Sequence, residues 1–371
     1  MKTIALRKFF FCAVIVGLTS LWGLARPAQA QNAPDAQSIL KALESLPEAE
    51  RERILVEGAK KEGKVVWYTV DAPKTNEILT DAFRKKYPFI EVQFIRGKSR
   101  AIVDRVMNET RANRYLFDLA TTSTETFNLY PVEQVFAQYT SPAKDSIPQS
   151  RRADRWASAF IFVRTLGYNT NMVKEEDVPK TWEDLLDPKW KGKIMFDESS
   201  LPEVSTLYRK WGKEKATAYL DKLGKSGNLQ IQLGRNVMSQ LLAAGEAPLA
   251  VTIYAYEIEE LKQKQAPVEW ALIDPSPGVL QIMSIGRRAP HPYSAALLYD
   301  FVLGPDGQKI FAEMNRVPAN PQVKGKIARM DATIQDPRFA LETPDAAKPM
   351  GDDALNLLDE KILKVVFEKK Q

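Results

Sequence analysis

The chain has 371 residues, with 52 Lys and Arg against 47 Asp and Glu, and one cysteine, Cys12. Four of the basic residues and no acidic residue lie in the first thirty, which leaves 48 basic and 47 acidic side chains and no charge excess that would indicate a nucleic-acid partner. Because Cys12 lies in the same segment, the remaining residues exclude disulfides, thiol catalysis and cysteine metal sites, and must rely on an apolar core.

The first thirty residues have the pattern of a secretory signal peptide. A basic start precedes the mostly apolar stretch 9–24, and Ala28-Gln29-Ala30 forms a small-x-small cleavage site. We predict cleavage before Gln31 and secretion from the cytoplasm. The apolar stretch is short for a retained anchor, and no other stretch is long and apolar enough to span a bilayer.

The first half of the exported chain alternates strands and helices. After two helices within 35–61, strands are expected at 64–70, 90–95 and 117–123, with helices at 76–86 and from 99 onward. This spacing predicts a parallel α/β sheet. The following stretch, 129–154, has little periodicity and is expected to be connecting structure.

The stretch 156–196 is predicted to carry the chain from one lobe to the other past a ligand cleft. It contains an apolar strand at 156–163, a short helix at 179–186 that Thr181 caps, and a strand at 193–196. Pro188 prevents the helix from continuing, because proline lacks the backbone donor.

The α/β rhythm then repeats, which predicts a second lobe. Strands are expected at 229–233, 249–254, 271–273 and 280–285, and a final amphipathic helix at 352–370 is expected to dock on a lobe. We predict these parts: a signal peptide at 1–30, a helical segment at 31–62, lobe 1 at 63–155 plus 271–330, lobe 2 at 156–270, and a C-terminal helical tail at 331–371.

Six short segments, in this order and spacing, resemble one family. They are Gly63–Tyr68, Gly167–Asn169, Pro179–Leu185, Pro188–Ile194, Pro290–Pro292 with Ala295 and Ala296, and Gly307-Gln308. They resemble periplasmic solute-binding proteins of ABC importers, in the branch of ferric-iron-binding proteins and their relatives for thiamine, polyamines and phosphonates. The resemblance implies a type II periplasmic binding protein fold with two α/β lobes, a central ligand cleft, a two-strand hinge and delivery to an inner-membrane permease.

Loops at the carboxyl ends of the predicted strands are the expected ligand site, since ligands of open α/β sheets bind there and helix N-termini favour anions. These loops are rich in hydroxyl groups and backbone donors, and a hydroxyl-lined cleft with an arginine suits an oxyanion. The predicted ligand-binding residues are Tyr68, Thr69, Asp71, Ser99, Thr122, Ser123, Tyr168, Ser199, Ser200, Arg235, Tyr254 and Tyr256.

Two of these residues are chosen over their neighbours, and two others have two interpretations each. Tyr68 is preferred to Trp67 for the cleft, because neighbouring residues of a strand point to opposite faces. Tyr168 either stacks on the ligand or plugs the hinge. Arg235 either clamps an anion or is a surface arginine. Ser99 is a better cleft candidate than its basic neighbours, which are expected to be mostly solvated.

The resemblance implies that Tyr254 and Tyr256 are the metal ligands if the solute is ferric iron. Ferric-iron binders of this family usually carry two adjacent tyrosines here, whereas this chain has Ile253-Tyr254-Ala255-Tyr256. In a strand both phenols would share a face, and in a helix they would diverge by about 200°. The interpretation favoured is one cleft tyrosine and one packing tyrosine.

The function predicted is the periplasmic binding component of an ABC transporter that captures ferric iron with an anion, or a small organic or phosphonate-type anion. A polyamine or thiamine-type cation is the alternative ligand. An enzyme with the same two lobes is the alternative class, against which stands the absence of a nucleophile elbow or phosphate-binding glycine loop. No cofactor and no nucleic acid is expected, and the protein is expected to be a monomer.

Overall fold

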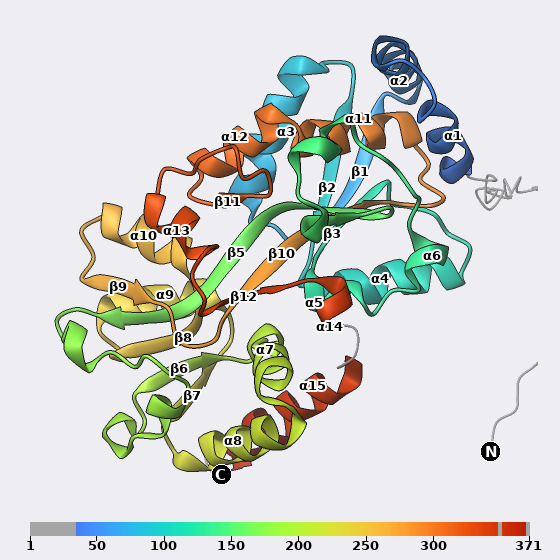
Figure 1. Cartoon of the computed structure of the whole chain (residues 1–371). Helices are drawn as coiled ribbons and strands as arrows, with labels where there is room; N and C mark the ends of the chain where they lie inside the picture. The colour runs from blue at the N-terminus through green and yellow to red at the C-terminus, as the bar shows by residue number, and fades with distance from the viewer. Residues whose placement is uncertain (1–34, 348–350, 369–371) are drawn as a thin grey trace, which may run out of the picture. The chain divides into compact units, whose positions relative to one another are not determined.

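A computed structural model describes residues 35–347 and 351–368 of the chain (Figure 1). The predicted signal peptide at 1–30 lies outside these residues, so its cleavage stays a prediction. Within the two described ranges, no helix combines the length and apolarity needed to cross a membrane.

Lobe 1 is built on three parallel strands, and its order of elements is the predicted one. β1 pairs with both β2 and β3 in parallel register. Pro73 occupies the first turn of α3, where its missing N–H costs nothing, so that helix starts before the expected residue 76. The elements of this part are α1 (Ala36–Leu43), α2 (Glu48–Glu62), β1 (Lys64–Thr69), α3 (Pro73–Lys86), β2 (Glu91–Arg96), α4 (Ser99–Arg111), β3 (Leu119–Ser123), α5 (Thr124–Phe127) and α6 (Val132–Val135).

Lobe 2 repeats the arrangement with a second set of parallel strands. β6 lies between β7 and β8 and pairs with both in parallel register. The elements are β6 (Ile194–Asp197), α7 (Leu201–Trp211), α8 (Lys213–Ser226), β7 (Leu229–Gln232), α9 (Arg235–Ala244), β8 (Leu249–Tyr254), α10 (Ala255–Gln263) and β9 (Val268–Ala271).

Two long strands, β5 (Trp156–Asn169) and β10 (Ser276–Ile285), connect the lobes. β10 pairs with β3 and with the first part of β5, while the last part of β5 pairs with β8 and β9. The hydrogen-bonded order β2-β1-β3-β10-β5-β8-β6-β7 therefore runs from one lobe into the other (Figure 1). β5 continues six residues beyond the predicted strand, because both halves of it have sheet partners.

The helix expected at 179–186 and the strand expected at 271–273 differ from the sequence expectation. The helix expected at 179–186 is only a 3-10 turn at Glu183–Leu186, although the capping contacts exist: the Asp184 carboxylate accepts from the Thr181 N–H at 2.9 Å. Pro188 ends the segment, because proline cannot continue the helix, and Asp187 caps the next 3-10 turn, where its side chain accepts from the Lys189 N–H at 2.9 Å. The strand expected at 271–273 lies at Val268–Ala271 instead, because antiparallel pairing with β5 fixes it there.

The C-terminal part returns first to lobe 1 and then to lobe 2. The final helix expected at 352–370 is divided by a π-helical segment, and its buried Leu358, Ile362 and Val366 pack with the apolar core of lobe 2. The elements are α11 (Pro292–Leu303), α12 (Pro305–Glu313), β11 (Val317–Pro318), α13 (Ala328–Thr333), β12 (Phe339–Glu342), α14 (Pro344–Ala347), α15 (Gly351–Leu357), the π-helix Leu358–Leu363 and α16 (Lys364–Glu368).

Candidate ligand-binding site

The carboxyl end of β1 holds a buried carboxylate. Asp71 accepts hydrogen bonds from the Thr69 hydroxyl at 3.2 Å and from the Gln281 amide on β10 at 3.0 Å. Burial raises the pKa of Asp71 to about 6, and the bonds from Thr69 and Gln281 oppose that rise. The predicted pair Thr69 and Asp71 thus connects the end of β1 to a strand that crosses between the lobes.

Hydroxyl groups gather where β3 ends and α4 begins. The Ser123 hydroxyl donates to the Glu125 carboxylate at 2.7 Å, and it lies 3.4 Å from the Ser99 hydroxyl. Thr122 is buried and bonds to the Thr126 hydroxyl next to it. The structure therefore brings Ser99 and Ser123 together, as the loop prediction requires, while Thr122 is engaged within lobe 1.

In lobe 2, Arg235 braces the loop that follows β6. Its guanidinium forms an ion pair with Asp197 at 3.0 Å, and it also donates to the Ser199 hydroxyl at 3.0 Å and to the Thr252 carbonyl at 2.7 Å. Burial acts to raise the pKa of Asp197, but Arg235 and the bonds from Ser199 bring it below the usual range. Arg235 is thus a buried arginine and not a surface one, and its donors hold the loop; its role as an anion clamp stays a prediction.

Ser200 and Thr252 are buried residues that support the same loop by hydrogen bonds. The Ser200 hydroxyl donates to the Asp197 carbonyl at 2.6 Å and forms a hydrogen bond of 3.0 Å with the Thr252 hydroxyl, and both side chains are buried. Thr252 has a φ of 75°, which is strained for a β-branched residue, at the point where the register of β8 with β5 shifts. This strained backbone turns the Thr252 carbonyl to Arg235, so the strand irregularity positions the loop.

Arg164 is a buried cation at the crossing that sequence reasoning missed. Its guanidinium forms an ion pair with Glu203 on α7 at 3.3 Å, and the two side chains are 4% and 1% exposed. Nε of Arg164 is buried and has no acceptor among the described residues. Burial raises the pKa of Glu203, against the opposing effect of Arg164. The available signal was an arginine within an otherwise apolar strand, at a position where a charge must be paired.

The rings of Tyr254 and Tyr256 stack, with centroids 5.3 Å apart and planes inclined by 22°. Tyr254 ends β8 and Tyr256 lies in the first turn of α10, so neither the strand nor the helix spacing applies across the pair. Arg164 lies over the Tyr254 ring at 4.7 Å, and Arg316 lies over the Tyr256 ring at 3.2 Å. Arginines thus face both tyrosines of the stack.

The hydroxyl groups of Tyr254 and Tyr256 differ in hydrogen bonding and exposure. The Tyr256 hydroxyl donates to the Glu257 carboxylate at 3.2 Å, and burial raises its pKa well above the usual value, so this phenol stays neutral. The Tyr254 hydroxyl forms no hydrogen bond with the described residues, and its residue is partly exposed. Within residues 35–347 and 351–368, no cluster of three or more His, Cys, Asp or Glu side chains could hold a metal ion.

Tyr68 and Tyr168 lie apart from these groups. Tyr68 is 1% exposed, and its hydroxyl donates to Glu109 at 2.9 Å on the α4 side of the sheet. Trp67 is equally buried, so strand alternation did not bring either ring into the cleft. Tyr168 lines a groove of 590 Å³ beside β9, in which no other predicted site residue takes part.

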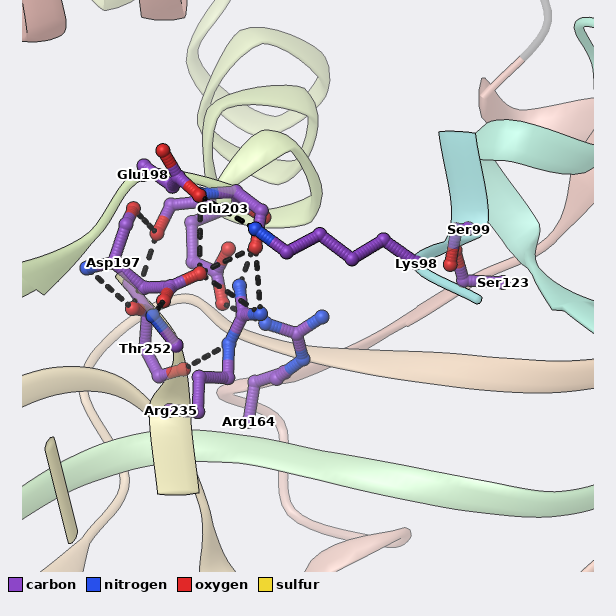
Figure 2. A network of polar contacts seen from close by, with 12 residues as sticks. Lys98, Ser99, Ser123, Arg164, Asp197, Glu198, Glu203, Arg235 and Thr252 are labelled. Atoms are coloured by element: carbon purple, nitrogen blue, oxygen red, sulfur yellow. Dashed lines mark hydrogen bonds and ion pairs between the residues drawn. The ribbon is translucent and has the colours of Figure 1, made fainter. Parts of the chain in front are cut away.

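One ion pair joins the two halves of the candidate site. Lys98, at the start of α4, reaches across to Glu198 in the loop after β6, with Nζ 3.0 Å from the carboxylate. Figure 2 shows this side chain spanning the space between Ser99 and Ser123 on one side and the Asp197, Arg235 and Arg164 network on the other. The predicted loops of both lobes therefore face each other, with Arg164 on the lobe 2 side.

A two-lobed α/β fold with facing polar loops at the strand ends defines the class of periplasmic solute-binding proteins. The model of the family "bacterial extracellular solute-binding protein" matches residues 119–339, and the chain belongs to this family. It is the solute-binding component of an ABC transporter, and binding proteins of this family deliver their ligand to a permease.

Relatives named for different ligands resemble the chain. A putative 2-aminoethylphosphonate-binding periplasmic protein of Salmonella paratyphi A is 21% identical over 79% of this chain and 84% of the relative. Iron uptake protein A1 of Synechocystis is 23% identical over 61% of this chain and 67% of the relative. The crystal structure of iron-bound HitA from Pseudomonas aeruginosa has a TM-score of 0.69 at 20% identity, covering 80% of this chain and 98% of that one.

Proposed function

We propose that the solute is a small oxyanion, such as a phosphonate, a phosphate ester or a carboxylate, held between the lobes with Arg164 as its main cationic contact. The observation that carries the proposal is the Arg164 guanidinium: it is buried at the crossing, lies on Tyr254, and keeps an Nε–H without an acceptor in the described part of the chain. A buried donor without a partner costs about 1–3 kcal/mol, so an anion that accepts from it gains that amount.

The surroundings of Arg164 support an anion. The Ser99 and Ser123 hydroxyls face the network of Arg235 and Ser199, and α4 and α7 begin at these two loops. Helix N-termini present unpaired N–H groups and partial positive charge, which favour phosphonate and carboxylate oxygens. Resemblance to the 2-aminoethylphosphonate-binding relative points in the same direction.

Ferric iron with a synergistic anion is the second candidate, and the stacked pair of Tyr254 and Tyr256 is the observation in its favour. Two features count against coordination by both phenols. Tyr256 stays neutral and donates to Glu257, and the arginines over the two rings disfavour a bare cation. Tyr254 alone would then supply the phenolate.

The test compares two variants that differ in buried charge. Arg164→Gln leaves Glu203 as an uncompensated buried carboxylate, whereas Arg164→Gln with Glu203→Gln replaces the ion pair by two neutral amides. Calorimetric titration with 2-aminoethylphosphonate, inorganic phosphate and citrate should show binding to the natural protein and a loss of at least about tenfold in both variants, since a charge-assisted hydrogen bond contributes ~1.5–3 kcal/mol. The double variant should recover most of the thermal stability that the single variant loses.

Two results would contradict the oxyanion. Undiminished anion affinity in the double variant would remove Arg164 from the site. A visible phenolate-to-iron absorption band with ferric salt, lost in Tyr254→Phe, together with no binding of any tested anion alone, would establish iron as the solute.

We further propose that the protein acts as a monomeric binder in the periplasm, after cleavage of residues 1–30, and transfers its solute to a permease without chemical change. The lobe boundaries given above are part of this proposal. Recovery of an unaltered solute from the protein, and a monomer mass in light scattering, are the expected results. Product formation in the absence of a permease would contradict it.

A further inference from the structure

The C-terminal tail adds a third strand at the place where β5 and β10 cross between the lobes. β12 pairs in parallel with the start of β10, with Ser276 opposite Phe339 and Val279 opposite Glu342. On its other edge the start of β10 pairs with β5. The crossing therefore has the order β12-β10-β5, and Figure 1 shows β12 in red beside β10.

The side chain of Glu342 holds helix α7 of lobe 2. It is 2% exposed, and its carboxylate accepts from the Thr206 hydroxyl at 2.8 Å and from Ser205 at 3.2 Å. Arg209, one turn further along α7, forms an ion pair with the same carboxylate. Three donors of one helix therefore converge on a single buried charge.

The backbone around Glu342 is held by lobe 1. The Thr124 hydroxyl on α5 donates to the Glu342 carbonyl at 3.0 Å, and it also accepts from the Leu280 N–H of β10 at 3.1 Å. Two residues further on, the Pro344 carbonyl accepts from the Asn128 amide at 2.8 Å. Glu342 therefore binds lobe 2 with its side chain and lobe 1 with its main chain.

The two helices that Glu342 contacts, α7 and α5, carry or adjoin residues of the candidate site. α7, which Glu342 holds, also carries Glu203, the partner of Arg164. α5, which Thr124 belongs to, follows Ser123 of the hydroxyl group in lobe 1. The residues matched by the family model end at 339, so Glu342 and the tail helices lie beyond the matched segment.

We propose that β12 is a third hinge strand and that Glu342 is a positioning residue, which fixes α7 relative to α5 and so restricts opening of the lobes. The buried carboxylate cannot leave the α7 donors without losing all three bonds, while the Thr124 bond keeps its strand on lobe 1. The proposal rests on the two-lobed fold alone and needs no assumption about the solute.

The experiment measures the distance between the lobes in the full-length mature protein without any ligand. Because the only cysteine is Cys12 in the leader, Lys85→Cys on α3 and Lys222→Cys on α8 provide two exposed label positions for single-molecule energy transfer. In Glu342→Ala the transfer-efficiency distribution should broaden and shift to a lower mean. Glu342→Gln, which keeps an acceptor of the same size, should restore part of the natural distribution.

Asp353→Asn is the matched control, because Asp353 is also a tail carboxylate, but is half exposed and bonds within lobe 2, to Lys213 at 2.7 Å. Its distribution should equal that of the natural protein. Thr124→Val is the second variant: it removes the lobe 1 contact while leaving the Glu342 charge paired, and should shift the distribution as Glu342→Ala does. If Glu342→Ala does not fold, Thr124→Val decides. An unchanged distribution in folded Glu342→Ala or in Thr124→Val would overturn the proposal.

Discussion

Buried charges are the main residue-scale feature of the site. Arg164, Asp71 and Asp197 are each enclosed, and each survives because neighbouring groups satisfy it: a carboxylate for Arg164, amide and hydroxyl donors for Asp71, and Arg235 for Asp197. Sequence reasoning placed Asp71 and Arg235 in the cleft from their loops, but not Arg164, since a strand position gives no sign of what lies across the sheet.

Asp71 should make stability depend on pH. Its pKa is raised by burial to about 6 in the folded protein, above ~3.9 in the unfolded chain, so its contribution is full below about pH 4 and is lost as the pH rises through 6. The free energy of unfolding of the natural protein minus that of Asp71→Asn should fall by about 2–3 kcal/mol between pH 4 and pH 7. Urea unfolding across this pH range measures the difference. A difference that stays constant with pH would contradict a pKa of Asp71 that is raised by burial.

At the scale of elements, strand pairing determines the length of β5 and the existence of β12, which the local sequence does not. β5 is one strand because β10 pairs with its first part and β8 with its last part. The short segment 179–186 has the capping residues of a helix but remains a 3-10 turn at 183–186. β12 has no separate signal in the sequence and exists because β10 offers it an edge.

Gly224 on α8 is the position that tests docking of the C-terminal helices. A Cβ there would lie 2.0 Å from the Lys361 carbonyl oxygen, which belongs to the backbone and cannot turn away. Alanine normally stabilises a helix by about 1 kcal/mol relative to glycine, but Gly224→Ala should instead destabilise the protein by about 1–3 kcal/mol.

Urea unfolding measures the loss in Gly224→Ala, and hydrogen exchange should increase in residues 353–368. Lys222→Ala, on an exposed position of the same helix, is the control and should change stability by less than ~0.5 kcal/mol. Stabilisation by Gly224→Ala would mean that the tail helix does not pack on α8.

At the scale of the whole molecule, two lobes with facing loops are joined by strands, and the ion pair of Lys98 and Glu198 reaches across between the loops. Lys98 and Glu198 have side chains that are 81% and 33% exposed. Because water and salt screen such a pair, the crossing strands and not this contact should determine how the lobes are held.

A double-mutant cycle of Lys98→Ala and Glu198→Ala measures the pair. The coupling free energy in urea unfolding should be about 0.2–1 kcal/mol at low salt and should vanish near 1 M NaCl. A salt-independent coupling above ~2 kcal/mol would show that the pair is desolvated and holds the lobes together.

Export of the protein is tested by determining the first residue of its mature form. Expression of the full sequence in a Gram-negative host should give a periplasmic protein that begins at Gln31, as intact mass and N-terminal peptides would show. A product that retains residues 1–30 and fractionates with the membrane would indicate an anchor.

Sequence by itself determined the class of the molecule. Apolar periodicity and strand–helix alternation are local, so they predicted the lobes' strands and helices, and the order of short segments was enough to resemble the correct family. Tertiary structure alone decided which groups meet at the site. Arg164, Glu203 and Arg316 come from distant segments, the stacking of Tyr254 on Tyr256 depends on where β8 ends, and Glu342 acts through contacts with both lobes. Pairing of buried charges is long-range, and local sequence patterns do not encode the partner.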